Sequence, residues 1–356
     1  MTDTLADYQS MTPADLTAAI VRRKAEWGSS LVILGHHYQD MAVVGVADHV
    51  GDSLKLCRLA AAQREARHVL FCGVKFMAEA ADILTPDTTT VQLAAFGAGC
   101  PMADMADIPE VTAAYDRISA LKGAAPAPVV YMNSSSELKA FCGSRGGVVC
   151  TSSNAARIMQ WGMDTAGSVL FFPDANLGLN SARALGLPPG QVVVWDRRRE
   201  DGGLKDKALA EARVVLWNGF CHVHVSFTPK QVEAVRQAFP RAKVVVHPEC
   251  SPEVTALCDA VGSTEMIIDF LRSQEAGARV YVGTEVHLVE RMARDLPRLT
   301  VLPLSIGAVC YNMAKTTLAQ VALALDPDNL GVRGRVTVDP AVARDARTAL
   351  DRMLTL

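Results

Sequence analysis

Short apolar runs alternate with amphipathic stretches along most of the chain. Runs such as LVIL at residue 31 and QVVVW at residue 191 are continuously apolar and rich in β-branched residues, which is typical of parallel strands buried on both faces. Further runs of this kind begin at residues 68, 128, 168, 212, 242, 279 and 299. Helical patterns lie between them, over 53–66, 154–161, 229–238, 264–274 and 285–294. This alternation predicts an α/β fold built on parallel sheets, in which ligands bind beyond the carboxyl ends of the strands.

Three predicted strands end in two polar residues that are separated by one position. These pairs are His36 and Tyr38, Tyr131 and Asn133, and His247 and Glu249. After each pair, a small hydroxyl residue is expected to open a helix, at Ser53, Ser152 and Thr264. Another strand and turn follow, and each copy ends with a cysteine in a loop, at Cys100, Cys221 and Cys310. The same features in the same order, three times over, indicate a threefold internal repeat.

The middle copy is longer than the outer two, whose spacings agree closely. Its excess includes the polar stretch WDRRREDGGLKDK at 195–207 and the glycine-rich FCGSRGG at 141–147, for which we predict an inserted loop. Three such units in one chain pack most simply around a pseudo-threefold axis, and equivalent positions then converge on that axis. We therefore expect the three repeated cysteines to meet.

Three converging cysteines favour a metal centre. They cannot supply all four thiolates of an ordinary [4Fe–4S] cluster, so one iron would be left without a protein ligand. An open coordination position of that kind acts as a Lewis acid on substrate oxygens. A zinc ion held by three cysteines and a water is an alternative at this point. Each cysteine taken alone is equally compatible with a buried core thiol.

The polar residues at the strand ends are candidates for acid–base chemistry and for binding anions. Glu249, beside His247 and a metal, suits a general base. Tyr38 could exchange a proton with an enol oxygen, and His36 and His222 could hydrogen-bond anionic groups. The hydroxyl residues are expected at helix starts, where they cap the helix or help its free N–H groups to bind phosphate or carboxylate. They are Ser53, Ser152, Ser153, Ser263 and Thr264.

Composition narrows the class of protein. The 356 residues carry a net charge of −3, which gives no general case for nucleic acid or an anionic membrane as a partner. The first residues, MTDTLADYQS, lack a signal-peptide pattern, and no apolar run approaches the roughly 18 residues that span a bilayer. The 9 cysteines include no CxxC pair, and an odd number argues against a disulfide framework. We expect a cytoplasmic protein.

Ten short motifs, taken together, resemble those of one known family. They are ILGHHYQ, VGDSL, GVKFMAE, AGCPMADM, YMNSSSELK, VCTSSNA, FFPDANLG, HPECSPEV, GSTEM and CYNM. In this order they are similar to the motifs of the quinolinate synthases, which make the pyridine ring of NAD in the bacterial de novo pathway. The resemblance runs from about residue 18 to residue 325.

The resemblance implies three αβα domains around a pseudo-threefold axis with a central [4Fe–4S] cluster. The expected domains are repeat 1 at 18–110, repeat 2 at 111–212 and repeat 3 at 213–312, with the C-terminal helices of 313–356 packing back on repeat 1. The implied cluster ligands are Cys100 in repeat 1, Cys221 just after repeat 2 and Cys310 in repeat 3, which leave one iron open.

The family's reaction condenses iminoaspartate with dihydroxyacetone phosphate to give quinolinate, phosphate and water. The resemblance implies that Tyr38, His247 and Glu249 are catalytic. The substrate-binding residues that it implies are His36, Ser53, Tyr131, Asn133, Ser152, His222, Ser263, Thr264 and Met313. An aspartate oxidase or dehydrogenase would supply iminoaspartate, and neither nucleic acid nor a membrane is expected as a partner. Two other classes stay open, a zinc-dependent hydrolase or lyase acting on a phosphorylated metabolite and a non-catalytic metabolite-binding protein.

Overall fold

The computed structural model describes residues 4–356, which divide into two compact units. The first unit extends to Cys100 and takes in Val309–Asp339 as well, and the second consists of Pro101–Ala308 and Pro340–Leu356. Each unit is built from parallel strands with helices between them, so the predicted α/β class is confirmed. The first unit thus ends at Cys100 rather than at the predicted 110, and the chain returns to it at 309.

The first unit contains one sheet, in the order β14-β4-β3-β1-β2. Its strands are β1 (Leu31–His36), β2 (His49–Gly51), β3 (His68–Cys72), β4 (Thr90–Leu93) and β14 (Arg335–Val336). Four of these strands are parallel, and β14 pairs antiparallel with β4 at the edge. The helices of this unit are α1 (Leu5–Gln9), α2 (Pro13–Trp27), α3 (Met41–Val46), α4 (Ser53–Ala62), α5 (Lys75–Leu84) and α15 (Leu318–Ala324), with the 3₁₀ helix η1 (Gly28–Ser30).

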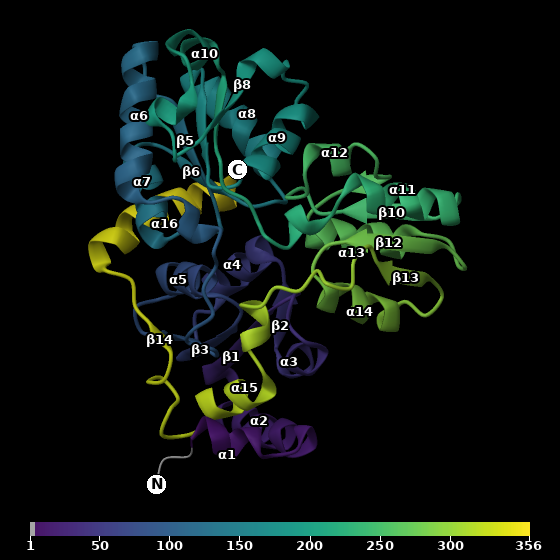
Figure 1. The fold of residues 1–356 in the computed structure, drawn as a ribbon. Coiled ribbons are helices and arrows are strands. Elements are labelled where there is room, and N and C mark those ends of the chain that lie inside the picture. Colours follow the sequence, from purple (N-terminus) through teal and green to yellow (C-terminus); the bar gives the residue numbers. More distant parts are fainter. Residues whose placement is uncertain (1–3) are drawn as a thin grey trace. The chain divides into compact units, whose positions relative to one another are not determined.

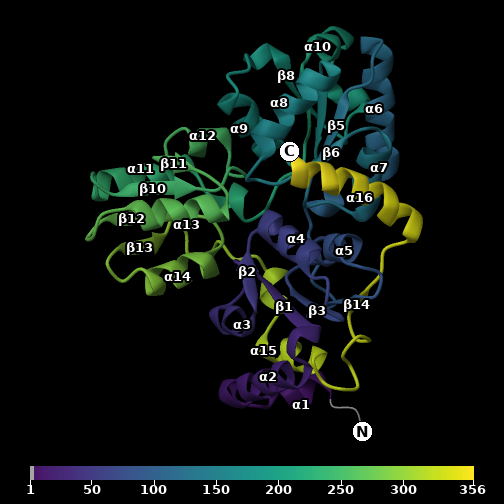
Figure 2. The ribbon, with the colours of Figure 1, turned by 180° about the vertical axis from the view of Figure 1, so that it is seen from behind.

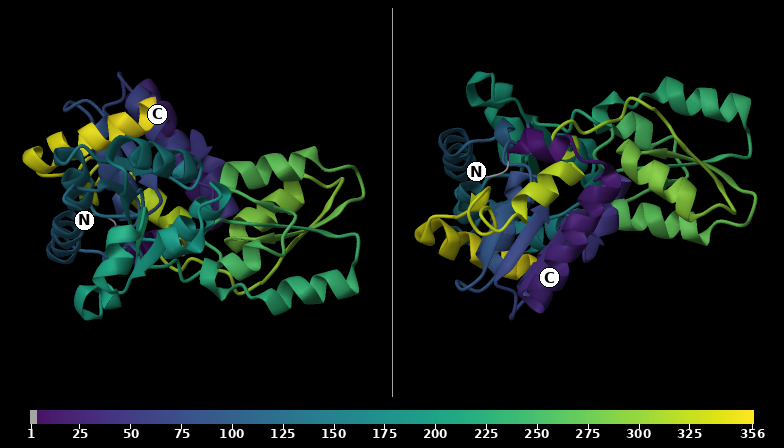
Figure 3. Two further views of the ribbon diagram at one scale, coloured as in Figure 1. Left: turned by 90° about the horizontal axis from the view of Figure 1, so that it is seen from above. Right: turned by 90° about the horizontal axis from the view of Figure 1, so that it is seen from below.

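The second unit contains two sheets, in the orders β6-β5-β7-β9-β8 and β11-β10-β12-β13. The first of these is formed by β5 (Ala127–Tyr131), β6 (Val148–Cys150), β7 (Val169–Phe172), β8 (Val192–Trp195) and β9 (Val214–Trp217). The other is formed by β10 (Lys243–Val246), β11 (Ala260–Val261), β12 (Arg279–Gly283) and β13 (Thr300–Pro303). Helices lie on both sides of the strands of this sheet, as the green segments in Figure 3 show.

The helices of the second unit connect these strands. They are α6 (Ile108–Lys122), α7 (Ser136–Ser144), α8 (Ala155–Ala166), α9 (Ala175–Ala184), α10 (Asp206–Glu211), α11 (Pro229–Ala238), α12 (Pro252–Thr255), α13 (Thr264–Ser273), α14 (Val286–Asp295) and α16 (Pro340–Thr355). Two short 3₁₀ helices, η3 (Pro189–Gln191) and η4 (Glu200–Gly203), flank β8. The polar stretch at 195–207 therefore belongs to an additional strand and its connection, which explains the greater length of the middle copy.

All three sheets repeat the same strand order. In each sheet the first strand lies between the second and the third, as in β2-β1-β3-β4, β6-β5-β7-β9 and β11-β10-β12-β13. The loop after each repeated cysteine also follows one pattern. A 3₁₀ helix begins three positions after the cysteine, at η2 (Ala103–Met105), η5 (His224–Ser226) and η6 (Met313–Lys315). The next helix then has its N-cap at the same distance from each cysteine, at Asp107, Thr228 and Thr317. The internal repeat is therefore present in the local structure as well as in the sequence.

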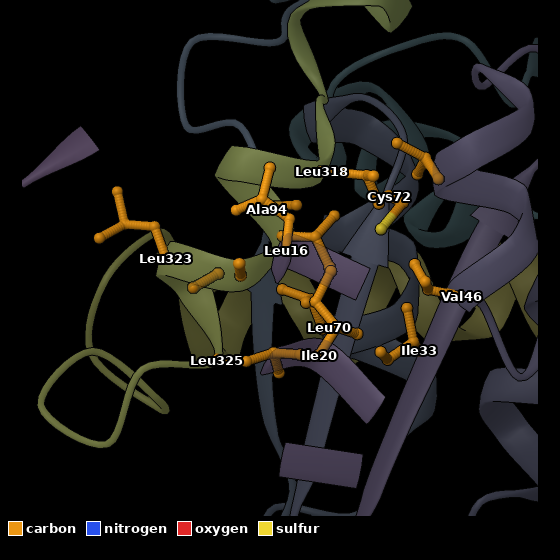
Figure 4. Close-up of a cluster of buried hydrophobic side chains, with 14 of the residues drawn as sticks. Leu16, Ile20, Ile33, Val46, Leu70, Cys72, Ala94, Leu318, Leu323 and Leu325 are labelled. Atoms are coloured by element: carbon orange, nitrogen blue, oxygen red, sulfur yellow. The ribbon is translucent and has the colours of Figure 1, made fainter. Parts of the chain in front are cut away.

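The core of the first unit shows why α15 belongs to it. The sequence LAQVALA of this helix is almost entirely apolar, and Leu318, Val321 and Leu323 are buried. They join a cluster with Leu16 and Ile20 of α2 and with side chains of the sheet, several of which are labelled in Figure 4. Figure 2 shows α15 beside α1 and α2, so this part of the C-terminal region packs on the first sheet.

The last helix, α16, packs elsewhere, and the prediction that the C-terminal helices lie on repeat 1 is wrong for it. It runs along α7 and β6 in the second unit (Figure 1). The reason is a close backbone approach, because a Cβ at Gly143 would overlap the carbonyl oxygen of Asp345. The guanidinium of Arg352 also donates to the carbonyl oxygen of Gly147. The FCGSRGG stretch thus contains the C-terminal turn of α7 and contacts α16. It is not the inserted loop that we predicted.

Candidate functional site

The loop after β1 carries two of the predicted site residues of the first unit. The main-chain N–H of Tyr38 donates to Nδ1 of His36 over 3.2 Å, and the two rings meet edge to face with centroids 4.7 Å apart. His36 is buried, whereas Tyr38 is partly exposed. Because Nδ1 is an acceptor, a neutral His36 ring carries its proton on Nε2.

Two hydrogen bonds link this loop and both cysteine loops of the first unit. Nε2 of the buried Gln39 donates to the carbonyl oxygen of Met313 over 3.2 Å and lies 3.4 Å from its Sδ. Nζ of Lys315 donates to the carbonyl oxygen of Gly97 over 2.7 Å and to Oδ1 of Asn312 over 2.8 Å. Since Gly97 precedes Cys100 and Lys315 follows Cys310, the two cysteine-bearing loops are held together.

The loop after β10 repeats the geometry of the loop after β1. The main-chain N–H of Glu249 donates to Nδ1 of His247 over 3.3 Å, as that of Tyr38 does to His36. His247 and Glu249 are both buried. Glu249 therefore stands at the position in its loop that Tyr38 has in the first copy.

Glu249 is the centre of a buried polar cluster. Its Oε2 lies 2.6 Å from Nδ1 of His224, whose Nε2 lies 3.1 Å from Oγ1 of Thr284. The His224 ring stacks on His247, with centroids 4.3 Å apart and an angle of 17° between the planes. The hydroxyl of Tyr131, which ends β5, also hydrogen-bonds Glu249. Residues from three strand ends and one cysteine loop thus surround one carboxylate.

The environment keeps the carboxylate charged and the neighbouring imidazole neutral. Burial opposes ionisation of Glu249, but the electrostatic interaction with the imidazoles of His224 and His247 and the hydrogen bonds from His224 and Tyr131 lower its pKa to about 2. Burial, reinforced by the charge of His224, lowers the pKa of His247 to about 3. At neutral pH, Glu249 is therefore an ionised base beside a neutral His247.

Asp174 is a second buried carboxyl group in this region. It caps α9, where Oδ1 accepts from the N–H of Leu177 over 2.7 Å, and it also receives a hydrogen bond from the backbone of Cys221. Burial and the charge of Glu249 raise the pKa of Asp174 well above its ordinary value. Asp174 and Glu249 are thus driven toward opposite protonation states, which is the pattern of acid–base pairs in enzymes.

The predicted metal ligands differ from most of the other cysteines in exposure. Cys100, Cys221 and Cys310 are partly exposed thiols. Buried thiols are found at Cys57, Cys72, Cys142, Cys150 and Cys250. The remaining one, Cys258, is partly exposed, but its Sγ donates to the carbonyl oxygen of Val254, and burial raises its pKa to about 12. Three of the four partly exposed thiols thus lie at the repeated positions.

The hydroxyl residues occupy helix starts in two of the three repeats. Ser53 is the first residue of α4, after the N-cap Asp52, and Thr264 is the first residue of α13, after the N-cap Ser263. Oγ of Ser263 is buried and has no hydrogen-bond partner within residues 4–356, which suits a ligand atom at this helix start. In the middle repeat the prediction is wrong, because α8 begins only at Ala155 and Ser152 lies in the preceding turn.

Two further predicted residues lie next to this cluster in the chain. Asn133 is partly exposed in the turn after β5, and His222 is partly exposed between Cys221 and η5. His224, which we did not predict, is the residue that contacts Glu249. The repeat itself contained the signal, because His224 and Met313 each begin the 3₁₀ helix three positions after their cysteine.

One group of side chains has the composition of a metal site. One ligand atom each from Cys221, His224 and Glu249 lies within 4.8 Å of the other two. In residues 4–356, no helix is both long enough and apolar enough to cross a membrane.

Comparison with known proteins agrees with this geometry. The family model described as "Quinolinate synthetase A protein" matches residues 18–355. A quinolinate synthase of Acidobacterium capsulatum is 42% identical over 361 residues, which cover 99% of this chain and 96% of the relative. One of Geobacillus kaustophilus is 42% identical over 352 residues, covering 98% and 95%. One of Corynebacterium glutamicum is 40% identical over 353 residues, covering 98% and 90%. The chain therefore belongs to the quinolinate synthase family of NAD-biosynthetic enzymes.

Proposed function

We propose that this protein condenses iminoaspartate with dihydroxyacetone phosphate to form quinolinate, with release of phosphate and water. We further propose that it works in the cytoplasm and receives iminoaspartate from an aspartate oxidase or dehydrogenase. The observation that carries this proposal is the recurrence of one partly exposed cysteine at the same place in three copies of one structural unit. Family membership and the buried base Glu249 support it.

The proposed cofactor is a [4Fe–4S] cluster held by Cys100, Cys221 and Cys310. The residues suit this group, because all three thiols are accessible in loops, and the link from Lys315 to Gly97 draws two of these loops together. When bound, such a cluster would supply an iron without a protein ligand, which polarises substrate oxygens as a Lewis acid. The proposed arrangement of the repeats around a pseudo-threefold axis would bring the third thiol to the same point.

The side chains of the second unit are assigned to proton transfer. We assign Glu249 as the general base, because it is ionised at neutral pH and lies among groups that exclude water. The Nδ1–H of His224 and the hydroxyl of Tyr131 hold the carboxylate in place. His247 would offer Nε2–H to a substrate oxygen, because its Nδ1 already accepts from the backbone of Glu249.

The other predicted residues are assigned to substrate binding. Tyr38 would deliver or accept a proton at an enol oxygen, with His36 beside it. Helix starts that carry Ser53, Ser263 and Thr264 present free N–H groups, which suit carboxylate or phosphate. The remaining contacts are assigned to Tyr131, Asn133, Ser152, His222 and Met313.

The proposal is tested by replacing single cysteines in protein that is purified without oxygen. Cys100→Ser, Cys221→Ser and Cys310→Ser should each abolish quinolinate formation and lower the iron content, because each removes one of three ligands. Cys258→Ser is the matched control, since this partly exposed thiol is bonded within its own segment, and Cys57→Ser controls for a buried thiol. Iron loss in either control, or full activity in any of the first three variants, would contradict the ligand assignment. Colourless wild-type protein that contains zinc would favour a zinc enzyme instead.

A further inference from the structure

We propose that Cys221, His224 and Glu249 form a mononuclear zinc site, which binds Zn²⁺ when no iron–sulfur cluster holds Cys221. All three residues belong to the second unit, and their ligand atoms lie within 4.8 Å of one another. The site thus needs neither Cys100 nor Cys310.

The donor set is one that zinc prefers. Zinc binds cysteine sulfur, histidine nitrogen and carboxylate oxygen at about 2.0 to 2.3 Å, usually with four tetrahedral ligands. Three protein ligands and one water would complete such a site. To admit the ion, the direct contact of 2.6 Å between Nδ1 of His224 and Oε2 of Glu249 must open.

The surroundings already hold the ligands as outer partners of a metal site do. If Nδ1 of His224 binds zinc, Nε2–H is left to donate to Oγ1 of Thr284, which lies 3.1 Å away. Partners of this kind fix the ring orientation of most metal-bound histidines. The stacked ring of His247 fixes the plane of His224, and the hydroxyl of Tyr131 fixes the carboxylate.

Charge and access both favour a divalent cation. A lone charge is costly in the protein interior. At this site the two negative ligands, a thiolate and the carboxylate of Glu249, would neutralise the charge of Zn²⁺. Cys221 is partly exposed, so one ligand of the site is in contact with solvent, whereas His224 and Glu249 are buried.

Zinc at this position would exclude the cluster, because both need the thiolate of Cys221. The zinc ion would also bind the carboxylate of Glu249, the proposed general base. The zinc site itself does not depend on the proposed function, whereas the competition with cluster assembly rests on it.

The experiment uses the full-length protein, stripped of metal with a chelator under anaerobic conditions and titrated with Zn²⁺ against a competing chromophoric chelator. We expect one Zn²⁺ per chain. Cys221→Ser, His224→Gln and Glu249→Gln should each raise the Kd for zinc more than about 100-fold, since losing an outer partner alone costs about 10- to 100-fold. Thr284→Val should raise it about tenfold. Cys100→Ser and Cys310→Ser should leave it unchanged.

Co²⁺ serves as a second probe, in case a variant folds poorly. In the wild type it should give a thiolate-to-cobalt charge-transfer band, which Cys221→Ser abolishes and which Cys100→Ser and Cys310→Ser retain. Loss of zinc affinity in Cys100→Ser or Cys310→Ser would overturn the proposal in favour of a three-cysteine site. An unchanged Kd in folded His224→Gln and Glu249→Gln would overturn it as well. If zinc binds as expected but does not slow cluster reconstitution, the zinc site stands and the cluster assignment of Cys221 fails.

Discussion

In the first unit, β1 leads into His36 and Tyr38, and in the second unit, β10 leads into His247 and Glu249. The backbones of the two loops agree. The N–H of Tyr38 donates to Nδ1 of His36 over 3.2 Å, and the N–H of Glu249 donates to Nδ1 of His247 over 3.3 Å. The side chains around them do not agree. Tyr38 is partly exposed, whereas Glu249 is buried against His224.

The difference shows how a repeated scaffold acquires distinct chemical roles. A buried carboxylate needs partners, because an isolated charge in the protein interior is costly. His224 in the second cysteine loop supplies one for Glu249, while the matching position in the third loop is Met313, whose carbonyl oxygen and sulfur accept from Gln39. One backbone therefore supports an ionised base in one copy and a phenol in another.

Removing the charge of Glu249 should have the largest effect on kcat of the changes that test this comparison. Glu249→Gln keeps the size of the side chain but cannot accept a proton, so kcat should fall about 10²- to 10⁴-fold, the range for general acid–base catalysis. Iron content should stay at the wild-type level. Single-turnover quinolinate formation and iron analysis measure the two quantities.

A nearby acid outside the cluster provides the control for this variant. Glu253 is the second residue of α12 and is hydrogen-bonded to Ser251, so Glu253→Gln should leave kcat unchanged. Normal turnover by Glu249→Gln would show that another group is the base.

The phenol of Tyr38 should matter less than the carboxylate of Glu249. Tyr38→Phe removes one hydrogen bond to a charge-bearing oxygen, a contact worth about 1.5 to 3 kcal/mol. Since about 1.4 kcal/mol corresponds to a factor of ten in rate, kcat/KM should fall roughly 10- to 100-fold. A loss as large as that of Glu249→Gln would break the proposed division of roles.

Most strands of the fold could be predicted from the sequence, because short local runs of apolar residues indicate them. All nine apolar runs that predicted strands form strands, including β1 at Leu31–His36 and β12 at Arg279–Gly283. The shortest strands, such as β11 at Ala260–Val261, carry too few residues for a periodic pattern, and their pairing with a neighbour defines them.

The site could be predicted only in part, since its contacts join distant segments. The repeat pointed to Glu249 and His247 as candidates, but the bond between His224 and Glu249 depends on how two loops meet in space. The surface on which α16 packs could not be predicted for a similar reason. Gly143 permits a close approach of two backbones, and no pattern within α16 shows which surface receives it.

The pH dependence of stability tests whether His247 is buried and neutral. Its pKa is lowered from 6.5 to about 3 in the folded protein. Below pH 6.5 the unfolded chain therefore takes up a proton that the folded chain does not, and the free energy of unfolding falls as the pH falls. Glu249, whose pKa is lowered from 4.5 to about 2, adds to this loss only below pH 4.5.

His247→Asn should separate the two contributions. Asn retains an acceptor for the N–H of Glu249 but does not titrate. Below pH 6.5, the free energy of unfolding of His247→Asn should fall less steeply with falling pH than that of the wild type. The two slopes should differ by up to about 1.4 kcal/mol per pH unit. Urea unfolding at a series of pH values measures this slope, and equal slopes would mean that His247 is protonated in the folded state.

The smallest expected effect concerns the link between the cysteine loops of the first unit. Lys315 is exposed, so its hydrogen bonds to Gly97 and Asn312 should contribute about 0.5 to 1.5 kcal/mol. Lys315→Met should lower the free energy of unfolding by that amount and speed the release of iron to a chelator, because the loops of Cys100 and Cys310 lose a contact. In the second unit the matching position is Ser226, whose Oγ donates to the carbonyl oxygen of Val223 in its own segment. Ser226→Ala should therefore leave iron release unchanged, and equal effects of the two variants would mean that Lys315 stabilises its own turn rather than the pairing of the loops.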